Sequence, residues 1–367
     1  MLIAVITLEF FSFIATKLDL FLVNQTPGIY LTGRPNYSFL TNNSRTEFHS
    51  WGAWRKPNST TRQQSACFDV EIKANELGAR DDSFENVRKN SILLLGDSFA
   101  EGFGVEHNQT SQYLIEEKTG RNVLNFGTAG SFGPLQQLLI YKELAQELPH
   151  SSVLVYVLPA NDFADNDSEV WGGSRSNRLR YRPYYSIKGN PLHPWYFDEA
   201  KKTKNLEDNL HETFTPSLIN RFKRSLVHYT WSANGLRTAG YLLNHSVANS
   251  DSYYLKASEL QQKNLLLAYT EIVSLAGTRP VTFVIIPAIR DINELISNNG
   301  TVNYKNQNWY QGLKSLAVQS NGGFVDLLDL IPPNYPELYH SCDGHWSIEG
   351  NRWAASKIYK IFQNKNN

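Results

Sequence analysis

Residues 92–99 read Ile92-Leu93-Leu94-Leu95-Gly96-Asp97-Ser98-Phe99, an apolar run that ends in a glycine turn and a serine. A short run of apolar residues bounded by turn residues is typical of a strand. A strand that ends in a tight turn and presents a serine is how many hydrolases expose a nucleophile. A serine in this position also suits a helix N-cap, so Ser98 taken alone leaves both roles open.

Apolar runs alternate with helical patterns along much of the remaining chain. This alternation predicts an α/β fold with a parallel sheet between layers of helices. In such a sheet, ligands bind beyond the carboxyl ends of the strands. The expected strands lie near residues 91–95, 122–125, 152–158, 281–286 and 323–326, and the expected helices lie near 109–118, 134–147, 257–276, 306–319 and 348–362.

Three further polar motifs fall at the ends of predicted elements. Two of them follow predicted strands, and the third directly precedes the amphipathic stretch that begins at Ile348. All of them are therefore expected near the ligand-binding edge of the sheet. The motifs are Asn125-Phe126-Gly127-Thr128-Ala129-Gly130, Pro159-Ala160-Asn161-Asp162 and Asp343-Gly344-His345-Trp346-Ser347.

In the identity and order of these motifs, the chain resembles the SGNH, or GDSL-type, serine hydrolases. The resemblance covers residues 88–163 and 280–363. It implies a three-layer, flavodoxin-like α/β/α fold with an inserted lid region. It also implies hydrolysis of acyl esters by a serine nucleophile, without a cofactor or a metal ion. The implied residues are Ser98 as nucleophile, His345 as base, and Ser98, Gly130 and Asn161 as the oxyanion hole.

The chemistry of ester cleavage explains why these residue types are needed. A serine hydroxyl is a poor nucleophile at neutral pH, so an imidazole, here that of His345, must accept its proton and later return it to the leaving alcohol. A carboxylate must hold the imidazole in the right tautomer, and Asp343 is the nearest candidate. The backbone N–H groups of Ser98 and Gly130 and the side-chain amide of Asn161 would bind the negative oxygen of the tetrahedral intermediate.

The segment around His345 departs from the family pattern, because one residue rather than two separates the aspartate from the histidine. In an extended segment, residues two apart project to the same side, so a contact between Asp343 and His345 is sterically reasonable. Gly344 would allow an unusual backbone angle there. The segment also resembles the Asp-x-His-Trp motif of alginate O-acetyltransferases and related polysaccharide-modifying enzymes, although in those enzymes the motif precedes the serine.

Three functions are compatible with these residues. The first is an esterase that removes acyl groups, expected to be acetyl, from carbohydrate or cell-surface polysaccharide. The second is a polysaccharide O-acyltransferase that uses the same residues, with a membrane acyl-donor protein as a further partner. The third is a glycan-binding scaffold with a degenerate site, which would turn over no ester.

Other polar residues compete for some of these roles. Turn aspartates commonly bond to nearby backbone N–H groups, so Asp97 and Asp162 are interpreted as structural. His340 is the nearest rival for the role of base, and Asp326 for the role of orienting acid. Asn125 is open to interpretation as a turn residue at the end of a strand.

Motifs of other functional classes are incomplete in this sequence. The glycines between Gly96 and Gly104 lack both a following Gly-Lys-Ser/Thr and the G-x-G-x-x-G spacing, which disfavours phosphate binding. Ser98 has Ala100 in place of the second glycine of the G-x-S-x-G turn, and no H-E-x-x-H metal motif is present. Lysine plus arginine equals aspartate plus glutamate at 35 each, so the overall charge does not favour nucleic-acid binding.

The chain of 367 residues is longer than a usual single domain and divides by composition. Residues 1–23 are apolar and predict a membrane signal anchor with the catalytic domain on the periplasmic or extracellular side of the cell envelope; a buried helix of a soluble protein is the alternative. Residues 24–90 are expected to wrap the core as strands and loops. Residues 91–163 and 257–367 form the expected catalytic core, which residues 164–256 interrupt.

The insertion at residues 164–256 carries arginines interleaved with tyrosines, and it leaves the predicted sheet beside the expected oxyanion hole. Aromatic side chains suit the apolar faces of sugar rings. The insertion therefore predicts one wall of a carbohydrate site, and a lid whose aromatic residues pack on one another is the alternative.

Cys67 and Cys342 are the only cysteines, and Cys342 directly precedes Asp343. An even count is compatible with one disulfide in an oxidising compartment. Such a bridge would brace the predicted catalytic loop against the N-terminal segment. Two separate buried thiols are the alternative.

Overall fold

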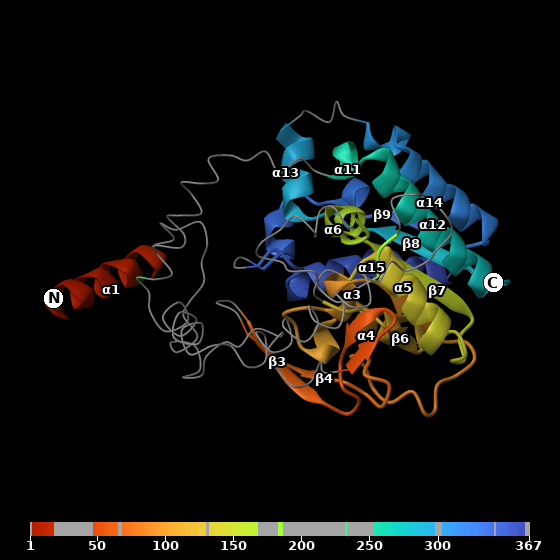
Figure 1. Ribbon diagram of the computed structural model, residues 1–367, viewed down its shortest axis with the longest axis horizontal. Coiled ribbons are helices and arrows are strands. Elements are labelled where there is room, and N and C mark those ends of the chain that lie inside the picture. The colour runs from red at the N-terminus through yellow and green to blue at the C-terminus, as the bar shows by residue number, and fades with distance from the viewer. Residues whose placement is uncertain are drawn as a thin grey trace, which may run out of the picture.

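A five-stranded parallel sheet lies at the centre of the protein, as the computed structural model in Figure 1 shows. The structure describes residues 2–17, 47–64, 68–129, 132–167, 183–185, 232, 253–297, 303–340 and 343–363. Every pair of neighbouring strands is parallel, which confirms the predicted α/β class. In spatial order the strands are β6 (Val123–Asn125), β5 (Ile92–Leu95), β7 (Ser152–Val157), β8 (Val281–Ile285) and β9 (Phe324–Asp326).

The strands β5, β7 and β8 are buried along their whole length. A strand covered on both faces needs no polar face, so its sequence is a nearly continuous apolar run rather than an alternation. The strand order is that of flavodoxin-like folds, in which the direction of winding reverses between β5 and β7. Ligands bind at such a switch point, beyond the carboxyl ends of the two strands.

Helices cover both faces of the sheet. Successive strand residues point to opposite faces, so Ile92 and Leu94 of β5 pack in one hydrophobic cluster while Leu93 and Leu95 pack in the other. Two helices of one layer, α12 and α14, lie side by side in Figure 1. The first cluster includes residues of α4 (Ser111–Thr119) and α15 (Ile348–Gln363), and the second those of α5 (Pro134–Ile140), α12 (Glu259–Ala276) and α14 (Asn308–Gln319).

The ends of the long helices follow from their flanking residues. Ser258 caps α12 by accepting a hydrogen bond from the Gln261 backbone at 3.2 Å, while the Gln261 side chain accepts one from the Ser258 backbone at 2.9 Å. Thr110 caps α4 in a similar way. Gly120, whose φ is 63°, ends α4 in the left-handed conformation that glycine adopts without strain.

Several short helices that the sequence analysis did not predict also occur. They span four to nine residues, which is too few turns to give a clear helical period in the sequence. Two of them contain predicted site residues, because α3 follows β5 and begins at Ser98, and α6 follows β7 and contains Asn161. These helices are α3 (Ser98–Glu101), α6 (Pro159–Asp165), α11 (Tyr253–Lys256) and α13 (Ile289–Ser297), and a π-helical turn at Tyr141–Ala145 continues α5.

The described residues that directly precede β5, 47–64 and 68–91, form two antiparallel hairpins and pack on the core. Trp54 and Phe84 are buried in the same cluster as the α5 residue Leu135. This burial brings residues 47–90 close to the edge of the sheet where the motifs lie. The hairpins pair β1 (Glu47–His49) with β2 (Gly52–Trp54), and β3 (Thr60–Gln64) with β4 (Asp69–Lys73).

Within the predicted anchor, the structure describes helix α1 (Leu2–Lys17). None of the helices among the described residues has the length and apolar character that crossing a membrane requires.

Cys67, Cys342 and most of the insertion at residues 164–256 lie outside the described residues. Tyr184 and Tyr185 of the insertion are described, and both are buried, with Tyr185 in the same cluster as α5 and α12.

Candidate active site

Ser98 and His345 are in direct contact although 247 positions separate them in the sequence. Ser98 is the first residue of α3, directly beyond the carboxyl end of β5, and His345 lies in the loop before α15. The Nε2 atom of His345 lies 2.8 Å from the Oγ atom of Ser98. This distance allows the hydroxyl to donate its proton to the imidazole.

The turn between β5 and α3 has little room for a side chain at position 96. A Cβ atom on Gly96 would lie 2.6 Å from the Cβ atom of Ala100, so only glycine fits there without a shift of the helix. The Asp97 carboxylate accepts a hydrogen bond from the Phe99 backbone N–H at 3.0 Å and caps α3. Ser98 is 5% exposed and is therefore buried rather than on an open surface.

Asp343 accepts a hydrogen bond from the Nδ1 atom of His345, opposite the nitrogen that faces Ser98. Partial burial by itself would raise the pKa of the Asp343 carboxyl, but the hydrogen bond and the charge of His345 outweigh burial, and the net pKa is lowered. Ionised Asp343 fixes the tautomer in which Nε2 is the free acceptor. The three residues therefore have the contacts that a charge-stabilised serine nucleophile requires.

The loop that joins Asp343 to His345 is a turn, which differs from the extended segment that the sequence analysis considered. Gly344 has a φ of 82°, a left-handed angle, and a Cβ atom there would meet no other atom within 4 Å. The backbone N–H of Gly344 donates to the His340 carbonyl at 3.2 Å, and the His340 N–H donates to the His345 carbonyl at 2.8 Å. The turn brings the two side chains together despite the shortened spacing.

Aromatic side chains hold the His345 ring in place. The ring lies 5.2 Å from that of Phe99 and 4.5 Å from that of Phe103, measured between centroids. Trp346 is buried and packs edge-on against Phe99 at 5.0 Å and against Tyr156 at 6.0 Å. Trp346 thus anchors the loop to the core next to the imidazole.

The predicted oxyanion-hole residues follow three adjacent strands, β6, β5 and β7. Asn161 lies in the first turn of α6, where its backbone N–H donates to the Leu158 carbonyl at 2.9 Å, and its side chain is half-buried. Gly130 lies outside the described residues, which end at Ala129 on this loop. The role of these residues as oxyanion donors stays a prediction.

Asn125 has a larger structural role than the sequence analysis gave it. Its side chain donates to the Ala100 carbonyl of α3 at 2.8 Å and accepts from the Gly127 backbone at 2.8 Å. It therefore ties α3, which begins at Ser98, to the loop that leads to Gly130. An asparagine at the end of a buried strand, two residues before a glycine, is the sequence signal for this role.

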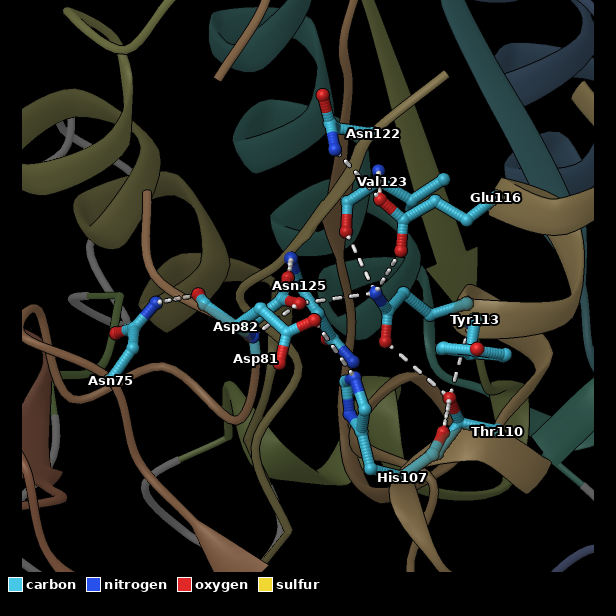
Figure 2. A network of polar contacts seen from close by, with 11 residues as sticks. Asn75, Asp81, Asp82, His107, Thr110, Tyr113, Glu116, Asn122, Val123 and Asn125 are labelled. Atoms are coloured by element: carbon cyan, nitrogen blue, oxygen red, sulfur yellow. Dashed lines mark hydrogen bonds and ion pairs between the residues drawn. The ribbon is translucent and has the colours of Figure 1, made fainter. Parts of the chain in front are cut away.

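A network of polar contacts also binds the backbone N–H of Asn125 (Figure 2). The Asn125 backbone N–H donates to the Asp81 carboxylate at 2.8 Å. Gln112 donates to Asp81 at 3.2 Å and to the carbonyl of Val123 at 3.1 Å. Burial raises the pKa of Asp81 well above its usual range. Residue Asp81 of the N-terminal segment is thus connected to the carboxyl end of β6.

Asp97 and Asp162, which the sequence analysis assigned to structure, both bond to the backbone of the turns that carry the site. Asp162 accepts hydrogen bonds from the Leu158 N–H at 2.9 Å and from the Tyr269 hydroxyl at 3.2 Å. Burial raises the pKa of Asp97 to about 7. Burial, and then the charge of Asp97, raises the pKa of Asp162 well above its usual range.

The variant Asp97→Asn is expected to be more stable than the wild type at pH 8. Asp97 binds its proton more tightly in the folded protein, with a pKa of about 7 against 3.8. Wild-type stability therefore falls as the pH rises from 4 to 7, while asparagine keeps the helix cap without this loss. Urea unfolding at pH 5 and pH 8 should show a gain that grows by about 2 kcal/mol over this range. An equal gain at both values would contradict the prediction.

The rival residues His340 and Asp326 have other contacts. Asp326, the last residue of β9, accepts hydrogen bonds from the Tyr304 hydroxyl at 2.8 Å and from the Leu328 N–H at 3.0 Å. The His340 ring packs against Phe68 at 5.0 Å, and burial lowers its pKa. Among the residues that the structure describes, no group of three or more His, Cys, Asp or Glu side chains is placed to hold a metal ion.

Solved structures similar to this chain include bacterial hydrolases. A lipase/acylhydrolase from Enterococcus faecalis is 13% identical, with a TM-score of 0.34, and the match covers 75% of this chain and 96% of that one. A protein from Desulfitobacterium hafniense DCB-2, described as lipolytic and of the G-D-S-L family, is 10% identical, with a TM-score of 0.33 and coverage of 74% and 99%. A protein from Lactobacillus plantarum is 10% identical, with a TM-score of 0.35 and coverage of 76% and 99%.

The comparison by sequence gives no relative. No family model matches the chain, and no curated protein matches it. The case for a function therefore depends on the contacts within the site.

Proposed function

We infer that the protein is a serine-dependent acyl esterase whose substrate is an O-acetylated carbohydrate or cell-surface polysaccharide. The observation that carries the proposal is His345, which contacts Ser98 through Nε2 at 2.8 Å and Asp343 through Nδ1. A histidine that links a serine at a strand end to a carboxylate is the arrangement used for acyl transfer on several unrelated folds.

In the proposed reaction, Ser98 Oγ attacks the ester carbonyl carbon while its proton passes to His345 Nε2. Asp343 stabilises the imidazolium that forms. The tetrahedral intermediate then collapses, the bond to the alcohol oxygen breaks, and Nε2–H returns the proton to the leaving alcohol. Water repeats the sequence on the acyl-enzyme, which releases the acid and restores the serine.

The negative oxygen of the intermediate needs donors that are in place before the reaction. The proposed donors are the backbone N–H groups of Ser98 and Gly130 and the side-chain amide of Asn161. The loss of one such donor typically costs about 3–4 kcal/mol in the barrier. The carboxyl ends of β6, β5 and β7 lie next to one another, which supports a shared role for the three segments that follow them.

The carbohydrate part of the proposal comes from the resemblance of Asp343–Trp346 to a motif of polysaccharide-modifying enzymes. The same acyl-enzyme could pass its acyl group to a sugar hydroxyl instead of water, with a membrane acyl-donor protein as partner. We propose the cell envelope as the location on the basis of the apolar segment at residues 1–23.

The proposal is tested with a fluorescent phosphonate and a chromogenic acetyl ester. We expect the phosphonate to label the full chain on Ser98 and to block ester turnover in step with labelling, because only an activated serine reacts with it. Turnover is then followed with and without acetyl-accepting oligosaccharides. Release of acetate at an unchanged rate supports hydrolysis, whereas acetylated sugar would assign the transferase. A wild-type protein that neither labels nor turns over ester would refute both and leave the glycan-binding scaffold.

A further inference from the structure

A buried ion pair lies between the helix of the nucleophile and the loop that leads to Gly130. Glu101 is the last residue of α3, and Arg55 directly follows β2 in the N-terminal segment. The Arg55 guanidinium contacts one carboxylate oxygen of Glu101, and the side chains are only 2% and 1% exposed. The other carboxylate oxygen accepts a hydrogen bond from the backbone N–H of Ala129.

The N-terminal segment makes further contacts with the same stretch of chain. Gln63 of β3 donates to the Glu101 carboxylate at 3.3 Å and accepts from the Gly104 N–H at 3.0 Å. Arg80 donates to the backbone carbonyls of Glu101 at 2.9 Å, Gly102 at 2.5 Å and Val105 at 2.5 Å. The side chains of Arg55, Gln63 and Arg80 therefore bind both the carboxylate and the backbone carbonyl of Glu101.

We propose that Arg55 and Glu101 are positioning residues that fix the Thr128–Ala129 peptide, in the loop that leads to Gly130, against the helix of the nucleophile. This inference rests on the proposed esterase function. Residues of the N-terminal segment thus position the proposed active site, in addition to packing on the core.

The chemistry of the pair explains why a charge is placed here. Two charges removed from water gain little net stability, because the cost of desolvation offsets their attraction. What the pair supplies is geometry, since a carboxylate with one oxygen held by a guanidinium presents its other oxygen to a backbone N–H from a fixed direction. The N–H that the carboxylate holds belongs to the Thr128–Ala129 peptide, one residue before the proposed oxyanion donor Gly130, so a shift of this peptide is expected to displace that donor.

The close approach of the loop to α3 supports the same inference. A Cβ atom on Gly127 would lie 2.4 Å from the backbone nitrogen of Glu101. The loop is therefore pressed against the helix at Gly127 and bonded to it at Ala129. With the Asn125 bonds to Ala100 and Gly127, the positions of the nucleophile and of the oxyanion loop are coupled through α3.

Two double variants of the full chain distinguish the effect of the hydrogen-bond acceptor for the Ala129 N–H from the effect of the two charges. Arg55→Met/Glu101→Gln removes both charges and keeps an acceptor for the Ala129 N–H, whereas Arg55→Met/Glu101→Met removes the acceptor as well. We expect kcat for the chromogenic acetyl ester to be about 100-fold lower in the second variant than in the first, with KM within about threefold, because a misplaced donor affects the transition state. Equal kcat values in two folded variants would overturn the inference.

A matched control comes from an exposed ion pair of the same segment. Arg62 and Asp69 pair across the β3–β4 hairpin, with side chains 63% and 29% exposed. Arg62→Met/Asp69→Asn should leave kcat within about twofold of wild type, since an exposed pair contributes little. If this control lost as much activity as Arg55→Met/Glu101→Met, a general effect of the segment would replace the positioning role.

Hydrogen exchange of the Ala129 amide tests the inference without any activity and in the wild-type chain. In protein labelled with ¹⁵N-alanine, Ala129 should exchange as slowly as amides of the central strands, because its N–H is bonded to a buried carboxylate. Exchange at the rate of an exposed loop would overturn the inference even if the double variants fail to fold. A wild-type protein with slow Ala129 exchange but no ester turnover would refute the esterase function alone.

Discussion

The variant Ser98→Ala is expected to lower kcat for an acetyl ester by about 10⁵- to 10⁶-fold. Alanine has no hydroxyl to contact His345 Nε2, so the variant must rely on direct attack by water. The fold should be unaffected, because Ser98 is the first residue of α3 and alanine is a good helix former. Steady-state kinetics, with circular dichroism as the check on folding, measure the effect.

The same residues should behave as one unit. His345→Ala should lose about as much activity as Ser98→Ala, and the double variant should lose little more, because a nucleophile without its base is already inactive. His340→Asn serves as the matched control and should stay within about fivefold of wild type, because the His340 ring packs on Phe68. Substantial ester turnover in folded Ser98→Ala would exclude Ser98 as the nucleophile.

The fold follows from the sequence where the apolar runs are long and continuous. The expected strands at 152–158 and 281–286 differ from β7 and β8 by a single residue at one end. Both strands are buried on two faces, so a continuous apolar run is enough to predict them and no alternation of polar and apolar residues is needed. The short helix α6 was not predicted, because its seven residues begin with Pro159 and include two aspartates, a residue type that is common in turns.

The site could be predicted only where a motif carries the chemistry. Ser98 and His345 stand out because each lies in a motif at an element end. Glu101 and Arg55 do not, because isolated charged residues normally lie in solvent. Their burial depends on the packing of residues 47–90 against α3, a contact between segments that no local pattern records.

The variant Asp343→Asn is expected to lower kcat by about 10⁴-fold with little change in KM. Asparagine can donate its N–H₂ to Nδ1 and favour the wrong tautomer of His345, so that Nε2 carries a proton and cannot accept one from Ser98. Because the pKa of Asp343 is lowered from 3.8, the wild-type carboxylate is ionised at every pH above 4. Its support of the imidazolium is present above that value and is lost only as the pH falls below it. Steady-state kinetics at pH 8, where the wild-type carboxylate is ionised, measure the deficit of the variant.

The matched control for this prediction is Asp326→Asn, which changes the rival acid at the end of β9. Asparagine can still accept from the Leu328 N–H, so kcat should change by less than about tenfold. A larger loss in Asp326→Asn than in Asp343→Asn would reassign the orienting acid.

Since Gly344 adopts a φ of 82° with open space around it, Gly344→Ala should lower the free energy of unfolding by about 1 kcal/mol through strain in the turn. The shortened Asp-x-His spacing works only because this turn, rather than an extended strand, brings the carboxylate to Nδ1.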